Sequence, residues 1–345
     1  MRFIANMILR FGVIEFLVII IVMANVLAFL LYKFEKPLKQ KKRCMYRALM
    51  MLATLAFGGI GAFFGMLFSK HGRGSRIIVA IGLVLTLIPM VHLVHALTLD
   101  RSIHYVEIEF RSVNWPEELD GYRIAFMTDF HRIPDETMRN ITAELNQRNL
   151  DLLLLGGDFS MLDGHYQGTL QAIAEIVTTD GIFGVEGNHD AYWRVFPLMI
   201  ELGITPLSNY GTHIRQGFYL AGIRDLWHRT HCIESAITGA YPEDFILLLS
   251  HNPDVAMQYP TDGIDLILSG HTHRGQITFF GFPIYLLRGS ITEYGTRFGR
   301  GFAYSQDGVP VFTSSGIGDY YIIPRIFARP EIVIFTMFYH DTHQE

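Results

Sequence analysis

Hydrophobic and polar positions divide the chain into two differently patterned regions. Three long apolar runs occupy about 12–32, 46–68 and 77–99, and from about residue 100 the pattern changes to short apolar runs separated by turns. Each long run is close to the roughly 20 residues that a helix needs to cross the hydrocarbon of a bilayer. Glu15 is the only acidic residue within them. We therefore expect residues 1–100 to form a region of three transmembrane helices and residues 101–345 to form a separate domain.

The loop between the first two apolar runs is strongly basic and predicts an orientation. The positive-inside rule places such a loop on the cytoplasmic side, and counting through three spans puts the second domain on the cytoplasmic face of a multi-pass cell-membrane protein. The opposite orientation, in which the second domain is exported, is favoured by Arg2, Arg10, Lys70, Arg73 and Arg76. The basic residues of the loop are Lys33, Lys36, Lys39, Lys41, Lys42, Arg43 and Arg47.

After residue 100 the chain alternates between strand-like apolar runs and helical stretches such as 135–148 and 166–178. This alternation is typical of an α/β domain whose strands are buried on both faces. Five of the runs end in polar side chains, as in "YRIAFMTDFH" and "IDLILSGHTH". Ligands of α/β sheets bind beyond the carboxyl ends of the strands, so we expect these side chains to converge. They are Asp129, His131, Asp158, Asn188, His189, Asp190, His251, His271 and His273.

The residue types at these strand ends predict a metal site. Carboxylates, imidazoles and an amide oxygen, with no thiolate, suit Mn²⁺, Fe²⁺ or Zn²⁺, and seven such groups are too many for one ion with open positions. Two ions that share a carboxylate generate a hydroxide nucleophile and stabilise an in-line displacement at phosphorus. A single histidine or aspartate after a strand is ordinarily a surface residue, but that explanation would need five coincidences. The pattern therefore favours a phosphoester hydrolase.

The five blocks, in this order, resemble the calcineurin-like metallophosphoesterases, which carry Asp-x-His, Gly-Asp, Gly-Asn-His-Asp/Glu, His and Gly-His-x-His. The resemblance runs from about Arg123 to the C-terminus. The segments "LLLSHNPD", "AGIRD" and "SSGIGDYYIIPRI" are similar to a narrower, membrane-tethered subgroup that includes UDP-2,3-diacylglucosamine pyrophosphatases. The resemblance implies a four-layer sandwich of two mixed β-sheets flanked by helices.

Carried over residue by residue, the resemblance also implies roles. It implies two divalent ions, with Mn²⁺ expected first and Fe²⁺ or Zn²⁺ as alternatives. His189 would be the general acid that protonates the leaving oxygen, and Asp158 would bridge the ions. The first ion would be held by Asp129, His131 and His273, and the second by Asn188, His251 and His271.

Two positions depart from the family pattern. Met161 stands where the protein-phosphatase branch has a second aspartate that supports the catalytic histidine, which favours the phosphodiesterase or pyrophosphatase branches. Arg274 stands where the subgroup tends to have glycine. It would place a guanidinium beside the phosphate, and we predict that Arg274 binds substrate. A pairing with a surface carboxylate is the alternative.

Charge and composition limit the classes of partner that the protein is expected to bind. Residues 1–100 carry twelve Lys and Arg against three Asp and Glu, whereas 101–345 carry sixteen against thirty. An acidic second domain disfavours nucleic acid, whose binders have a clustered basic face, and the two cysteines exclude a disulfide framework.

The segment 277–304 combines aromatic residues with Arg288, Arg297 and Arg300. Such a wall suits an acyl tail with phosphates, although ordinary sheet core explains it equally well. We expect membrane lipids as partners and hydrolysis of a phosphorylated lipid or nucleotide-lipid. A catalytically silent binding module, or an exported phosphodiesterase of non-lipid substrates, are the alternatives.

Overall fold

The computed structural model describes residues 19–33, 49–50, 52–54, 58–67, 76–98, 102–131, 133–160, 166–279, 281–283, 292–319 and 325–340. The chain divides into two compact units, Met1–Thr98 and Leu99–Glu345. Among the positions discussed above, Met161, Arg288 and residues 12–18 lie outside the described residues.

The first unit contains helical residues 19–33 together with α3 (Gly59–Leu67) and α4 (Arg76–Thr98). The backbones of α3 and α4 lie so close together that a Cβ added to Gly59 would collide with the backbone of Gly82 in α4. Polar atoms join them as well. The Gly59 N–H donates to Thr86 Oγ1 at 2.9 Å, and the Gly61 N–H donates to Asn25 Oδ1 at 2.8 Å. Small residues and buried hydrogen bonds therefore hold this unit together.

The prediction of three transmembrane helices at about 12–32, 46–68 and 77–99 is wrong. In the part of the chain that the structure describes, no helix has both the length and the apolar character needed to cross a membrane. The predicted multi-pass cell-membrane localisation is wrong for the same reason.

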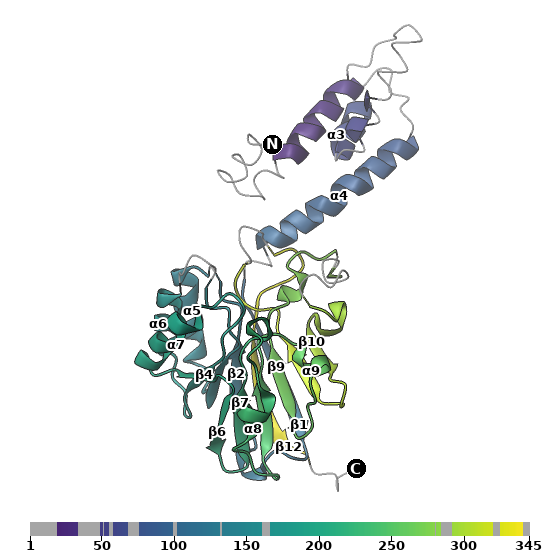
Figure 1. Ribbon diagram of the computed structural model, residues 1–345. Coiled ribbons are helices and arrows are strands. Elements are labelled where there is room, and N and C mark those ends of the chain that lie inside the picture. The colour runs from purple at the N-terminus through teal and green to yellow at the C-terminus, as the bar shows by residue number, and fades with distance from the viewer. Residues whose placement is uncertain are drawn as a thin grey trace. The chain divides into compact units, whose positions relative to one another are not determined.

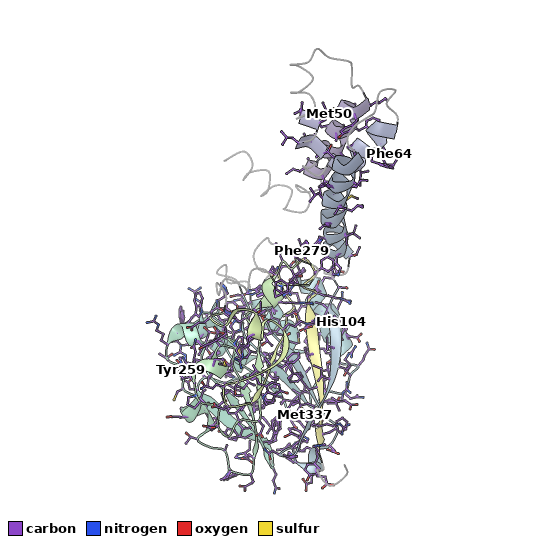
Figure 2. All side chains as sticks on the ribbon, turned by 90° about the vertical axis from the view of Figure 1, so that its right-hand side faces the viewer. Met50, Phe64, His104, Tyr259, Phe279 and Met337 are labelled. Carbon is purple, nitrogen blue, oxygen red and sulfur yellow. The ribbon has the colours of Figure 1, made fainter. Side chains whose placement is uncertain are left out.

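The second unit is built on two six-stranded mixed sheets. The first sheet has the order β1 (His104–Ser112), β12 (Glu331–Tyr339), β2 (Tyr122–Met127), β3 (Leu152–Leu155), β4 (Ile182–Gly184) and β5 (Thr205–Pro206). The second has the order β10 (Gly301–Tyr304), β11 (Pro310–Thr313), β9 (Leu266–Ser269), β8 (Phe245–Leu249), β7 (Phe218–Gly222) and β6 (Tyr210–Arg215). Strand β12 pairs parallel with β1 and antiparallel with β2, and Figure 2 shows His104 and Met337 at opposite ends of the β1–β12 pair.

Helices cover the outer face of each sheet (Figure 1). They are α5 (Asp135–Leu145), α6 (Gln167–Ala174) and α7 (Tyr192–Glu201) on the first sheet, with α8 (Ile233–Ile237) and α9 (Val255–Gln258) on the second. Helix α5 ends earlier than the predicted 135–148. Asn146 follows it, and its side chain binds the backbone of Glu175 and Val177 beyond α6.

Successive residues along one strand lie on opposite faces of the sheet and pack in different hydrophobic cores. In β2, Ile124 and Phe126 join the core between the sheets, whereas Ala125 and Met127 join the core under the helices. In β8, Leu247 packs between the sheets and Leu248 packs toward α8 and α9. Burial on both faces explains why these strands have continuous apolar sequences. The four layers fit the α/β fold of two mixed sheets that the resemblance implied.

Candidate metal centre

The strands that carry the predicted ligands end at matching positions. In the first sheet Met127 of β2 pairs with Leu155 of β3, which pairs with Gly184 of β4, and all three strands are parallel. In the second sheet Leu249 of β8 pairs with Leu268 of the parallel β9. Because parallel strands in register end at one edge of a sheet, the polar residues that follow them are brought together there.

Asp129, His131 and His273 form one buried group whose ligand atoms all lie within 4.8 Å of one another. His131 Nε2 lies 2.8 Å from His273 Nε2, and His273 Nε2 lies 3.2 Å from Asp129 Oδ1. Nitrogen and oxygen atoms from two sheets therefore converge on one point, which could hold an ion.

Asp129, Asp158 and His251 form a second buried group of the same kind. His251 Nε2 lies 3.3 Å from Asp158 Oδ2 and 3.1 Å from Asn188 Oδ1. Asp158 Oδ2 is also 3.6 Å from His131 Nε2 in the first group. Asp158 thus lies between the two groups, as a bridging ligand would, and Asp129 belongs to both.

The predicted ligand His271 is not a member of either group. Its ring packs edge-on against that of His251, with centroids 5.1 Å apart. Its backbone N–H donates to Asp129 Oδ1 and Oδ2 at 3.1 and 3.0 Å. His271 therefore lies at the site, but its ring nitrogens are not gathered with the other ligand atoms.

The backbone at the site is strained. Residues other than glycine rarely adopt positive φ, and holding one there costs about 1–3 kcal/mol. The surrounding structure must offset this cost at five of the seven predicted ligands. They are Asp129 (φ 56°), His131 (φ 43°), Asp158 (φ 56°), His271 (φ 68°) and His273 (φ 48°).

Electrostatics place His131, Asp129 and Asp158 in metal-binding protonation states. Burial lowers the pKa of His251, but Asp158 outweighs this effect and holds it well above the usual value. Burial, and then the neighbouring His273, lower the pKa of His131 to about 3, so its imidazole is neutral at pH 7. Burial raises the pKa of Asp129 and Asp158, but the adjacent histidines outweigh this effect and hold both below the usual range. The site offers ionised carboxylates, imidazoles and the Asn188 amide oxygen, a donor set that fits two divalent ions.

Asp190 is one of the strand-end residues, and the sequence analysis assigned it no role at the site. Its buried carboxylate accepts N–H groups from Gly187 and from residues 158–160 at 2.7–3.3 Å. It therefore joins the loop after β3 to the loop after β4. Burial and the nearby Asp158 raise the pKa of Asp190 to about 8. Its position directly after His189 was the only sequence feature that indicated this role, because its partners are backbone groups.

Arg325 is another buried residue that holds backbone groups near the site, and the sequence analysis did not select it. Its guanidinium is 2% exposed and donates to the carbonyl oxygens of Ser315, Gly318 and Ala328. Its Nη2 also lies 3.3 Å from Nδ1 of His273, on the other side of the ring from the ligand atom Nε2. Arg325 thus contacts a predicted ligand on the side of the ring away from Nε2.

His189 lies beside the two groups and outside both of them. Its backbone N–H donates to Asp158 Oδ1 at 2.8 Å, and its half-buried ring lies 5.5 Å from the ring of His131. This position leaves the His189 ring adjacent to the first group without making it a ligand.

The predicted substrate arginines have other described contacts. Arg274 has a φ of 54° and its guanidinium lies next to Gly281, so a substrate contact stays a prediction. Arg300 pairs with Glu331 at 2.8 Å, and Arg297 donates to the carbonyl of Tyr304. Both of these arginines thus contribute to the structure around β10.

Residues 122–275 match the family model described as calcineurin-like phosphoesterase. In this sequence match and in its two ligand groups, the segment resembles a calcineurin-like metallophosphoesterase domain. The match supports the predicted class of enzyme, a metal-dependent phosphoester hydrolase.

Curated relatives are similar over the same part of the chain. A transmembrane protein with metallophosphoesterase domain of Danio rerio is 28% identical over 66% of this chain and 55% of its own length. The phosphodiesterase YaeI of Escherichia coli is 27% identical over 67% of this chain and 90% of its own length. A metallophosphoesterase of Helicobacter pylori is 29% identical over 62% of this chain. The chain spans little more than half the length of the Danio rerio and Helicobacter pylori proteins.

Proposed function

We propose that the chain hydrolyses a phosphodiester or pyrophosphate bond with two divalent ions, Mn²⁺ first and Fe²⁺ or Zn²⁺ as alternatives. The observation that carries this proposal is the position of Asp158, whose Oδ2 lies 3.6 Å from His131 and 3.3 Å from His251. One carboxylate thereby serves both ligand groups. When bound, such a pair of ions supplies Lewis acidity and a nucleophile derived from water at neutral pH.

His189 is the proposed general acid. It follows Asn188 in the loop after β4, and its backbone N–H is held by Asp158. A ring beside the ligand groups, but outside them, is placed to donate a proton to the leaving oxygen. General acids of this kind contribute about 10²–10⁴-fold to a rate.

The proposed substrate is a phosphorylated lipid or nucleotide-lipid, of the kind that UDP-2,3-diacylglucosamine pyrophosphatases cleave. Support comes from the segment that follows His273. Phe279 and Phe282 are 48% and 54% exposed, and the Arg274 guanidinium lies next to Gly281 between them. Figure 2 labels Phe279. Exposed aromatic rings close to a guanidinium suit a substrate that has an acyl chain and a phosphate.

Hydrolysis assays on the purified full chain test this proposal. With Mn²⁺ present, the chain is offered bis-p-nitrophenyl phosphate, UDP-lipids, phospholipids and cyclic nucleotides, and His189→Ala serves as the control. We expect cleavage of the phosphodiester and of at least one lipid, with loss of both activities in the control. Cleavage of bis-p-nitrophenyl phosphate alone rejects the lipid substrate. No cleavage by a chain that binds two ions would instead indicate a silent binding module.

A further inference from the structure

One arginine contacts both ends of the loop that carries Asn188 and His189. The loop begins at Glu186, after β4, and ends at Tyr192, the first residue of α7. Arg224 Nε donates to Glu186 Oε1 at 3.0 Å, and the guanidinium carbon lies 4.1 Å from the centroid of the Tyr192 ring. The hydrogen bond uses the edge of the guanidinium and the ring contact uses its face. A single side chain therefore joins the two ends of the loop.

The register of the second sheet brings Arg224 to this position. Strand β7 runs parallel beside β8, with Gly222 paired to Leu249. Arg224 comes two residues after Gly222, just as the predicted ligand His251 comes two residues after Leu249. The backbone N–H of Arg224 donates to Asn209 Oδ1 at 3.2 Å. Arg224 thus extends from the second sheet to a loop of the first sheet, at the edge where the predicted ligands lie.

Glu186 is a fully buried carboxylate, with 0% of the residue exposed. Its Oε2 has no hydrogen-bond partner among the residues that the structure describes, and within them Arg224 is the only side chain that hydrogen-bonds its Oε1. Apolar side chains of similar volume usually stabilise a fold at least as well as a buried ion pair. Stability alone therefore does not account for this pair, whereas an ion pair fixes the direction in which the loop is held.

We propose that Arg224 is a positioning residue for the second ion, acting through the loop from Glu186 to Tyr192. By holding both ends of the loop, it fixes Asn188, whose Oδ1 lies 3.1 Å from Nε2 of His251 in the second ligand group. Groups behind a metal ligand orient it and thereby set the affinity for the ion. The inference rests on the two-ion site of the proposed function. The predicted ligands of the first ion, Asp129, His131 and His273, lie outside the loop.

The test is a Mn²⁺ titration of the chelator-treated full chain, by calorimetry and by electron paramagnetic resonance of free Mn²⁺. Arg224→Met keeps an unbranched side chain against the Tyr192 ring and removes the charge and the N–H donors. Arg148→Met is the matched control. The Arg148 guanidinium also lies over a tyrosine, 4.4 Å from the centroid of the Tyr105 ring, and pairs with Glu107 at 2.7 Å. None of these three residues belongs to a loop that carries a predicted ligand.

A second variant separates positioning from stability. Arg224→Met alone leaves the Glu186 charge buried without its partner, which is expected to destabilise the fold. Combining Arg224→Met with Glu186→Gln removes that charge, so the urea midpoint of the double variant should return toward that of the wild-type chain. The weakened binding of the second ion should persist in the double variant, because the loop still lacks the ion pair. Recovery of metal binding together with stability would show that the pair is merely structural, and would overturn the inference.

The wild-type chain and Arg148→Met should take up two equivalents of Mn²⁺ with the same affinities. In Arg224→Met the second equivalent should bind about 10–100-fold more weakly, as for loss of an orienting partner, and the first should be unchanged. In an Asn188→Ala background, Arg224→Met should have no further effect on the second equivalent.

Three results of the titration would overturn the inference: unchanged binding of both equivalents, equal weakening of both, or a full effect of Arg224→Met in the Asn188→Ala background. Uptake of fewer than two equivalents by the wild-type chain would instead reject the two-ion site of the proposed function, and the inference with it. Because the probe is Mn²⁺ alone, the result is independent of whether the wild-type chain hydrolyses any tested substrate.

Discussion

Replacing Asp190 by Ala should uncouple the loops that carry Asp158 and His189. The carboxylate accepts four backbone N–H groups, three from residues 158–160 and one from Gly187. Each buried donor left without an acceptor costs about 1–3 kcal/mol. If water reaches two of the four, the other two still cost about 2–6 kcal/mol. We therefore expect the free energy of unfolding to fall by at least about 2 kcal/mol.

Urea denaturation of the chelator-treated protein, followed by tryptophan fluorescence, measures this loss. All three tryptophans, Trp115, Trp193 and Trp227, lie in the second unit, so their signal reports on that unit. Glu243→Gln is the control, because it changes an exposed carboxylate and should shift stability by less than about 0.5 kcal/mol. A loss below about 1 kcal/mol for Asp190→Ala would show that its four N–H partners are satisfied in another way.

Three further predictions follow from the site. Asp158→Ala should abolish turnover and lower the metal content, whereas His189→Ala should keep the metal and slow turnover about 10²–10⁴-fold; equal metal loss in elemental analysis would contradict the assigned roles. Gly187→Ala should also lower the metal content, because a Cβ there would collide with Asp158, and normal metal content would refute this. Arg325→Met should lower the free energy of unfolding by about 2–4 kcal/mol, since three backbone carbonyls lose a buried donor. The control is Arg111→Met, which changes an exposed arginine and should alter this free energy little. Similar urea midpoints for the two variants would count against the argument.

The ligands could be found from the sequence because of how parallel strands are built. A strand buried on both faces is a short apolar run, such as Leu152–Leu155, and the first polar residues after it mark the strand end. Asp129, Asp158 and His251 are all of this kind. The convergence of several strand ends then needs no knowledge of the register, because the carboxyl ends of parallel strands share one edge.

The supporting residues could not be found in this way. Asp190 and Arg325 act on backbone N–H and carbonyl groups, and a sequence does not show which backbone groups lie near a side chain. The membrane prediction rested on hydropathy alone, and no helix in the described part of the chain has both the length and the apolar character to cross a membrane.

The supporting residues also explain how a strained site can persist. Five of the seven predicted ligands have positive φ, at a cost of about 1–3 kcal/mol each. Around them, Asp190 supplies acceptors for N–H groups, and Arg325 supplies donors for carbonyls. Buried hydrogen bonds contribute about 0.5–1.5 kcal/mol each, and about 1.5–3 kcal/mol where a charged group such as Arg325 takes part, so several of them together offset strain of that size. The positions of Asp158 and His273 are therefore set as much by these two non-ligating residues as by the strands themselves, and ligand geometry should respond to substitutions that leave every ligand in place.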